Sequence, residues 1–211
     1  MRTYLVMAMA WMVLAAPAVW AQKGIEVTPF VGYQINGGLG LTTPVFNRLN
    51  LHNGINFGVA GSYQLGQYTG VEFMWNHNKS NASAQFNDGG SSSRVLELTT
   101  NQYLGDFIIH FKPRESRLRP FVFAGLGVSN LAPGRADAGS ITRFAWSFGG
   151  GVKYNLSQHL GLRLQVKTSP TYINSGSKEF WCDPIWGGCW KIGENNFLQE
   201  LDFSGGVTFR F

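Results

Sequence analysis

Two cysteines stand in a segment of this sequence whose residue types and spacing suggest chemistry. Cys182 and Cys189 are the only cysteines, and Pro and Gly lie between them in W-C-D-P-I-W-G-G-C-W. In an exported chain, an even cysteine count around such a turn is typical of a disulfide. A metal site is the alternative, but two sulfurs without a nearby His form a poor ligand set. Trp181, Trp186 and Trp190 surround the pair, so this segment is either a surface for binding a partner, a glycan or lipid headgroups, or a self-packed aromatic cluster.

The histidines offer no comparable site. They are dispersed at His52, His77, His110 and His159, and none forms a pair with metal-ligand spacing. A hydrolytic site needs a His, a nucleophile and a carboxylate that converge. His77 with Ser80 is the candidate pair, but a separation of three residues puts them on opposite faces of a strand. We therefore expect no catalytic residue, no metal and no cofactor, and a lipid-modifying enzyme is kept as an alternative.

Charged residues are sparse. The chain has 17 basic and 12 acidic residues, and 14% of its residues are charged, against roughly 25% in a typical soluble domain. Because Lys and Arg are scattered singly rather than clustered, we expect no nucleic-acid partner. Nine of the charges fall on the polar side of an alternating pattern, where acids and bases could pair: Glu72, Asp106, Arg143, Lys153, Arg163, Lys167, Glu200, Asp202 and Arg210.

The elements that must position these charges are strands. Between Leu160 and Lys167, Leu and Val alternate with Gly, Arg, Gln and Lys, which is the period of a strand with two different faces. The same period predicts eight strands, at about 25–36, 55–64, 68–76, 102–111, 120–128, 143–154, 160–167 and 197–211. Polar connections separate them, alternately long and short: 37–53, 65–67, 78–93, 112–119, 129–141, 155–158 and 169–196. A proline at position 29 departs from strand rules and predicts a bulge.

The pattern fits two kinds of barrel. A lipocalin turns its apolar face inward, whereas a transmembrane barrel turns it toward lipid. Here the polar face consists mainly of Gly, Ala, Ser, Asn and Gln with single charges, which suits a narrow interior, and one Lys or Arg facing the bilayer midplane would cost about 2–4 kcal/mol. We therefore predict an all-β, eight-stranded antiparallel up-and-down transmembrane barrel with a plugged interior. Aromatic residues expected near the strand ends would form its interfacial girdle: Tyr33, Tyr63, Trp75, Phe111, Tyr154 and Phe211.

The chain begins with an export signal. Arg2 precedes an apolar run from Tyr4 to Ala16, and Val19-Trp20-Ala21 offers a small residue, Ala21, at the expected cleavage site. About 13 apolar residues are too few for the roughly 20 that span a bilayer as a helix. We expect a signal peptide at residues 1–21 and a single barrel domain at residues 22–211.

The last stretch, F-L-Q-E-L-D-F-S-G-G-V-T-F-R-F, resembles the C-terminal signal that the outer-membrane barrel-assembly machinery reads. Ser204, Gly206, Phe209 and Phe211 fill its polar, glycine and aromatic positions. Together with T-P-F-V-G-Y at 28–33 and R-P-F-V-F-A-G-L-G at 119–127, it makes the mature chain resemble the family of small outer-membrane barrels that includes the OmpA transmembrane domain, OmpX and the opacity proteins.

The resemblance implies a bacterial outer-membrane location, with lipid around the barrel and the assembly machinery as a partner during biogenesis. It implies a monomeric, non-enzymatic barrel that contributes to envelope integrity or binds an extracellular ligand or surface partner through its long loops. A narrow solute channel, a lipid-modifying barrel enzyme and a soluble lipocalin-like binder are the alternatives.

Overall fold

The computed structural model describes residues 24–40, 46–86, 93–134, 140–173, 181–183, 188–190 and 196–211. The expected signal peptide and Trp186 lie outside them. In the described part of the chain, no helix has the length and apolar character needed to cross a membrane.

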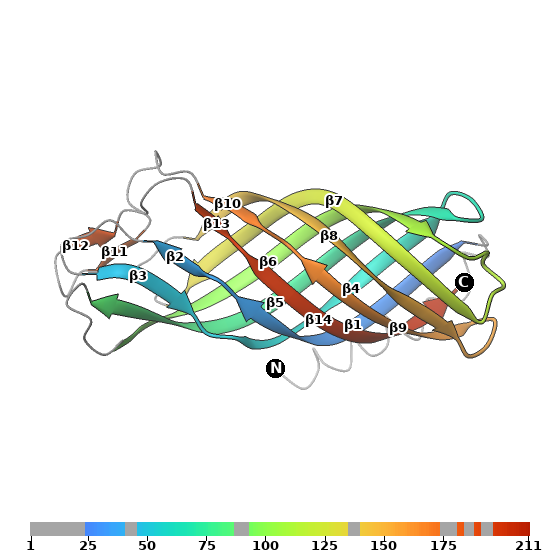
Figure 1. Cartoon of the computed structure of the whole chain (residues 1–211), viewed down its shortest axis with the longest axis horizontal. Coiled ribbons are helices and arrows are strands. Elements are labelled where there is room, and N and C mark those ends of the chain that lie inside the picture. The colour runs from blue at the N-terminus through green and yellow to red at the C-terminus, as the bar shows by residue number, and fades with distance from the viewer. Residues whose placement is uncertain are drawn as a thin grey trace, which may run out of the picture.

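Eight long strands close into one antiparallel barrel (Figure 1). They are β1 (Ile25–Asn36), β4 (Gly54–Gln64), β5 (Thr69–Phe86), β6 (Ser93–His110), β7 (Leu118–Pro133), β8 (Ile141–Asn155), β9 (Leu160–Thr168) and β14 (Glu200–Arg210). Each pairs with the next along the chain, and β14 pairs with both β9 and β1, which closes the ring. The predicted eight-stranded antiparallel barrel is confirmed.

The two ends of the barrel differ. At one end, tight turns span residues 65–68, 111–117 and 156–159, and Gly24 lies beside Phe211. We call this the short-turn end and the opposite one the long-loop end. Short strands occur at the long-loop end: β2 (Gly38–Gly40), β3 (Phe46–Leu51), β10 (Thr171–Ile173) and β13 (Asn196–Leu198). There too, β11 (Trp181–Asp183) and β12 (Gly188–Trp190) form a separate two-stranded sheet.

Side chains alternate between the interior and the outside as the period of two requires. On β9, Leu164 is 62% exposed, whereas the neighbouring Arg163 is 2% exposed. Large apolar side chains are exposed on all eight barrel strands, while Glu, Lys and Arg are buried in the lumen. This arrangement suits an apolar surrounding and a polar interior, the reverse of a lipocalin.

The strands extend further toward the long-loop end than the sequence pattern indicated. The predicted loop 78–93 is largely strand, because β5 continues to Phe86 and β6 begins at Ser93, with a register shift at Ala82/Ser83. The loop predicted at 129–141 is likewise shortened by β7 and β8, and the loop predicted at 37–53 contains β3, which pairs with β5. Backbone pairing needs no apolar side chains, so strands continue where the apolar alternation has stopped.

The bulge predicted at Pro29 is wrong. Glu26 pairs with Arg210 and Phe30 with Gly206 in the same register, so no residue is inserted between them. On the other side, Pro29 stays in register opposite Val59. A proline removes only its own donor from the ladder, and the strand absorbs that loss without an extra residue.

Candidate functional site in the barrel interior

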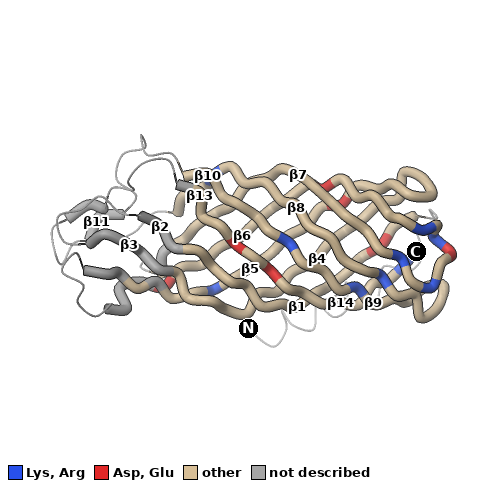
Figure 2. Tube along the Cα trace, viewed as in Figure 1, with Lys and Arg blue, Asp and Glu red and all other residues tan. Residues whose placement is uncertain are grey.

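The lumen holds a column of buried charges carried by inward positions of the strands. Ten charged side chains are at most 7% exposed: Glu26, Glu72, Asp106, Arg119, Lys153, Arg163, Lys167, Glu200, Asp202 and Arg210. Figure 2 shows that Lys and Arg gather toward the end at which the carboxyl end of the chain lies, which is the short-turn end. An isolated buried charge is costly, so the partners of each one determine what the lumen can do.

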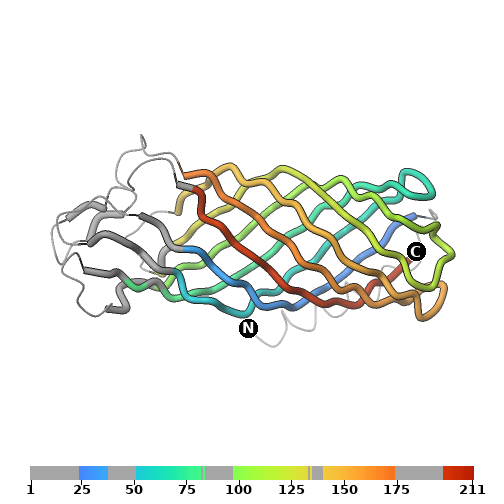
Figure 3. The backbone as a smooth tube through the Cα atoms, viewed as in Figure 1, coloured from blue at the N-terminus to red at the C-terminus, as the bar shows by residue number. Residues whose placement is uncertain are grey.

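Near the short-turn end, one carboxylate joins three strands. Lys153 Nζ donates to Glu26 Oε2 at 2.5 Å, and Arg210 Nε lies 3.4 Å from Glu26 Oε1. The strands β1 and β14 lie side by side although they are at opposite ends of the colour scale (Figure 3). This cluster therefore fastens the seam at which the first and last strands close the barrel.

Arg119 ties two of the turns together at the same end. Its Nε donates to Lys112 O at 3.1 Å, and its Nη2 donates to Gln67 O at 2.9 Å and to Gln64 Oε1 at 3.2 Å. Lys112 and Gln67 belong to the β6–β7 and β4–β5 connections, and Gln64 is the last residue of β4. The planar guanidinium suits this role because its donors are held in a fixed geometry.

The next pair toward the long-loop end is a two-point bridge across the lumen. Arg163 on β9 donates through both terminal nitrogens to Glu72 on β5, with Nη2 to Oε1 at 2.8 Å. Ser62 Oγ donates to the same carboxylate at 2.5 Å, and Arg163 Nε donates to Gln165 Oε1 at 2.7 Å. The guanidinium carbon of Arg163 also lies 4.7 Å from the ring centre of Phe121. The pair is thus almost fully satisfied, which is the condition for a stable buried ion pair.

At mid-height, apolar side chains occupy the lumen. Phe30, Ala60, Met74, Leu104 and Ala145 form one buried cluster. A second cluster, of Ile108, Phe121 and Phe123, lies nearer the short-turn end, where Phe121 pairs with His110 at the end of β6. Asp106 lies among these levels and accepts a hydrogen bond from Ser147 Oγ.

Toward the long-loop end, neutral amides hold the carboxylates. Gln34 Nε2 donates to Glu200 Oε1 at 2.9 Å, and Gln102 Nε2 donates to Glu200 Oε2. Asn56 Nδ2 donates to Asp202 Oδ2 and lies 3.0 Å from Asn76 Oδ1.

Lys167 is the buried cation near these carboxylates and amides toward the long-loop end. It lies opposite Asp202 on the neighbouring strand, and its Nζ donates to Gln102 Oε1 at 3.3 Å. Gln102 therefore connects Lys167 to Glu200.

The nine charges that the sequence analysis singled out lie on inward positions. Eight are buried and Arg143, near the start of β8, is half-buried. The structure brings Glu72 to Arg163. Lys153 and Arg210 meet Glu26, which was not among the nine predicted charges. Arg119 is also buried, although the sequence pattern assigned it to a turn. The sequence contains a signal for both missed residues. Glu26 is two positions from Thr28, and Arg119 is two positions from Phe121, so each lies on the same face of its strand as that neighbour.

The cysteine segment forms the β11–β12 hairpin. Cys182 lies directly opposite Cys189, and Trp181 lies opposite Trp190 in the backbone register. The disulfide stays a prediction. The proposed assembly signal lies on β14 and the residue that follows it: Ser204 faces inward, and Phe209 and Phe211 are exposed on the outside.

The histidines lie apart, as their spacing indicated. His77 Nδ1 is 2.8 Å from Asn101 Oδ1, and Ser80 is buried on the other face. A pair that the sequence analysis missed is His52 Nε2 and Ser83 Oγ, 2.7 Å apart, which the pairing of β3 with β5 brings together. Among the described residues, no three His, Cys, Asp or Glu side chains are grouped as metal ligands.

Comparison with known proteins agrees with this architecture. Residues 5–211 match the family described as outer membrane protein beta-barrel domain. The chain is 27% identical over 188 residues to outer membrane protein Omp38 of Acinetobacter baumannii, which covers 82% of this chain and 49% of the relative. It therefore spans about half the length of that relative.

Two solved structures have a similar fold. OprG from Pseudomonas aeruginosa has a TM-score of 0.60 at 10% identity, with 90% of this chain and 97% of that chain covered. Neisserial surface protein A has a TM-score of 0.58 at 12% identity, with 89% and 97% covered. At these identities the likeness concerns the fold alone. With its apolar outer face, its polar lumen and the family match over residues 5–211, the chain belongs to the outer membrane protein β-barrel domain family of the bacterial outer membrane.

Proposed function

We propose that this outer-membrane barrel is non-enzymatic and closed to solutes, and that it supports the envelope and binds partners through its long-loop end. The observation that supports a closed lumen is the apolar layer at mid-height. Met74 and Leu104 are fully buried there beside Phe30, between the Glu72–Arg163 bridge and the amide-held carboxylates. An eight-stranded barrel has room for its side chains and little more.

Planar-bilayer recording tests the closed lumen. Refolded protein inserted into the bilayer should give no stepwise conductance, while a porin added to the same membrane verifies that steps are detectable. Reproducible steps from the barrel alone would establish the narrow solute channel instead.

Surface binding is proposed for the aromatic hairpin. The backbone register brings Trp181 opposite Trp190 beside the paired cysteine positions, beyond the barrel sheet. Tryptophans are common anchors of binding surfaces. Replacing Trp181, Trp186 and Trp190 together with Ala should abolish adhesion of barrel-expressing cells to a glycan or host-cell surface. Trp75→Ala, on a barrel strand, is the matched control, and equal adhesion of the triple variant and wild type would refute this role.

A lipid-modifying activity is the second candidate because of the His52–Ser83 pair at the long-loop end. Ser83 is only 6% exposed, so its hydroxyl is largely shielded from a lipid substrate. We therefore expect overexpression to leave the lipid A mass spectrum unchanged. A mass shift that Ser83→Ala removes would identify an enzyme.

A further inference from the structure

The outer surface of the barrel carries a groove that runs from the short-turn end toward mid-height along β9. Its lower part, the one nearer the short-turn end, has a volume of about 380 Å³ and lies between Leu162 and Val207. Its upper part, toward the long-loop end, has a volume of about 450 Å³ and lies between Val166 and Phe203. Leu164 and Gly205 line both parts, so the two hollows adjoin.

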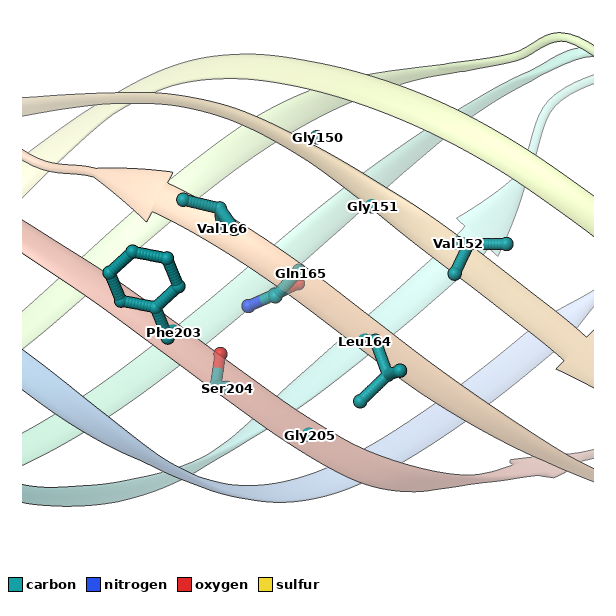
Figure 4. Close-up of a pocket in the computed structure, with 9 residues that line it drawn as sticks. All are labelled: Gly150, Gly151, Val152, Leu164, Gln165, Val166, Phe203, Ser204 and Gly205. Carbon is teal, nitrogen blue, oxygen red and sulfur yellow. The ribbon is translucent and has the colours of Figure 1, made fainter.

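Glycines on the outward face make this groove. Figure 4 shows Gly150 on β8 and Gly205 on β14 on either side of Leu164, with the Phe203 ring above. A Cβ at Gly205 would lie 3.1 Å from Leu164 Cδ2. Any larger residue at this position would therefore fill the groove. The side chains of the lining that point outward are largely apolar, with Leu162, Leu164 and Val166 on β9.

A second hollow, of about 750 Å³, lies at the rim directly below. It lies between residues 114–117 and 155–159, with Arg114, Arg117 and His159 in its lining and the buried Arg210 beside them. Glu115 is the acidic side chain of the lining, and the carboxyl end at Phe211 also lies there. Arg210 already faces Glu26 in the lumen, so Arg114 and Arg117 supply the charge that faces outward.

One contact joins the two hollows. The guanidinium carbon of Arg117 lies 5.4 Å from the ring centre of Tyr154, and Tyr154 lines the lower part of the apolar groove. Tyr side chains gather at the membrane interface, and a cation over the ring favours this level too, so Tyr154 and Arg117 indicate the height of the lipid headgroups. The basic hollow is therefore at headgroup height and the groove at acyl-chain height.

We propose that this composite surface holds one anionic phospholipid of the leaflet at the short-turn end, which faces the periplasm because short turns are periplasmic in such barrels. Arg114 and Arg117 bind the phosphate, and one acyl chain lies along β9 over Gly205. Shape and the two outward guanidinium groups favour this occupant, since Arg114 and Arg117 outnumber Glu115 in a hollow that lies next to an apolar groove. The inference rests on the membrane location and does not depend on whether the lumen conducts.

Native mass spectrometry of the refolded full chain in detergent tests the proposal. We expect wild type to retain one dioleoyl-phosphatidylglycerol, with dioleoyl-phosphatidylcholine bound roughly tenfold more weakly, because basic side chains near a membrane surface favour anionic lipid. Arg114→Gln with Arg117→Gln should remove this preference, and Gly205→Leu should weaken binding of both lipids.

Matched controls separate this site from general effects. Lys112→Gln removes a charge from the same end outside the hollow, and Gly61→Leu adds the same side chain at an outward glycine with no atom within 4 Å. Both controls should bind lipid like wild type. Every variant must show a difference in gel mobility between unheated and heated samples, which indicates that the barrel is folded.

Three results would overturn the proposal: equal retention of the two lipids by wild type, equal losses in the controls and the site variants, or displacement of the phospholipid by glycerol phosphate at the same concentration.

Discussion

The two halves of the lumen bury the same kinds of charge but stabilise them differently. In the short-turn half, Glu26 and Glu72 meet Lys153, Arg163 and Arg210 directly. In the long-loop half, amides of Gln34, Gln102 and Asn56 bind Glu200 and Asp202. The first arrangement depends on direct ion pairs, whereas in the second neutral amides donate to the carboxylates and Lys167 is linked to Glu200 through Gln102.

This difference has a mechanical consequence. Ion pairs across the lumen join strands that are not neighbours in the sheet, as the Glu72–Arg163 bridge joins β5 to β9. Removing one partner leaves the other charged and buried, which is far more costly than losing a neutral hydrogen bond. We therefore expect the short-turn half to be the more sensitive to single substitutions.

The largest effect is expected for Arg163→Leu. It leaves Glu72 buried in the lumen without its cation, and the free energy of unfolding should fall by about 3–5 kcal/mol. Urea titration in lipid vesicles, followed by the mobility difference between folded and unfolded protein, measures this. The double variant Glu72→Leu with Arg163→Leu removes both charges and should recover most of the loss. A double variant as unstable as the single one would show that shape, not charge, is what the bridge supplies.

A smaller effect is expected from one isosteric change made in each half. Glu200→Gln keeps an acceptor for one of its two amide donors, Gln34 or Gln102, and loses one neutral hydrogen bond, which should cost about 1–2 kcal/mol. Glu72→Gln leaves the Arg163 guanidinium without a counter-charge and should cost about 3 kcal/mol. The same unfolding titration ranks the two. Equal costs would contradict the distinction between the two halves.

The period of two predicted which charged residues enter the lumen, but it did not decide between the two faces of β7, because both are apolar or small. Phe121 and Phe123 face inward and Val122 faces outward there. It could not predict which charges meet, because contact across the lumen depends on the tilt and stagger of the strands rather than on the alternation within one strand. Glu72 and Arg163 are 91 positions apart, and neither sequence neighbourhood identifies the other.

The ends of β5 and β6 were mispredicted for a related reason. Apolar alternation marks the part of a strand that has one face toward lipid. Beyond that part the hairpin pairs through its backbone, with polar residues such as Asn78 and Ser80 on the inner face. The sequence pattern therefore reports the membrane-facing length of a strand, not its full length.

The smallest effect on barrel stability is expected from changes in the β11–β12 hairpin at the long-loop end. Cys182 and Cys189 lie opposite each other in a sheet separate from the barrel sheet, so a disulfide there would stabilise the hairpin by about 2.5 kcal/mol without strengthening the barrel. Replacing both with Ser should leave the urea midpoint of the barrel unchanged while accelerating proteolysis between β10 and β13. Maleimide should label the denatured wild type only after reduction. Labelling without reductant would rule out the disulfide, and a lowered barrel midpoint would mean that the hairpin is coupled to the strands below it.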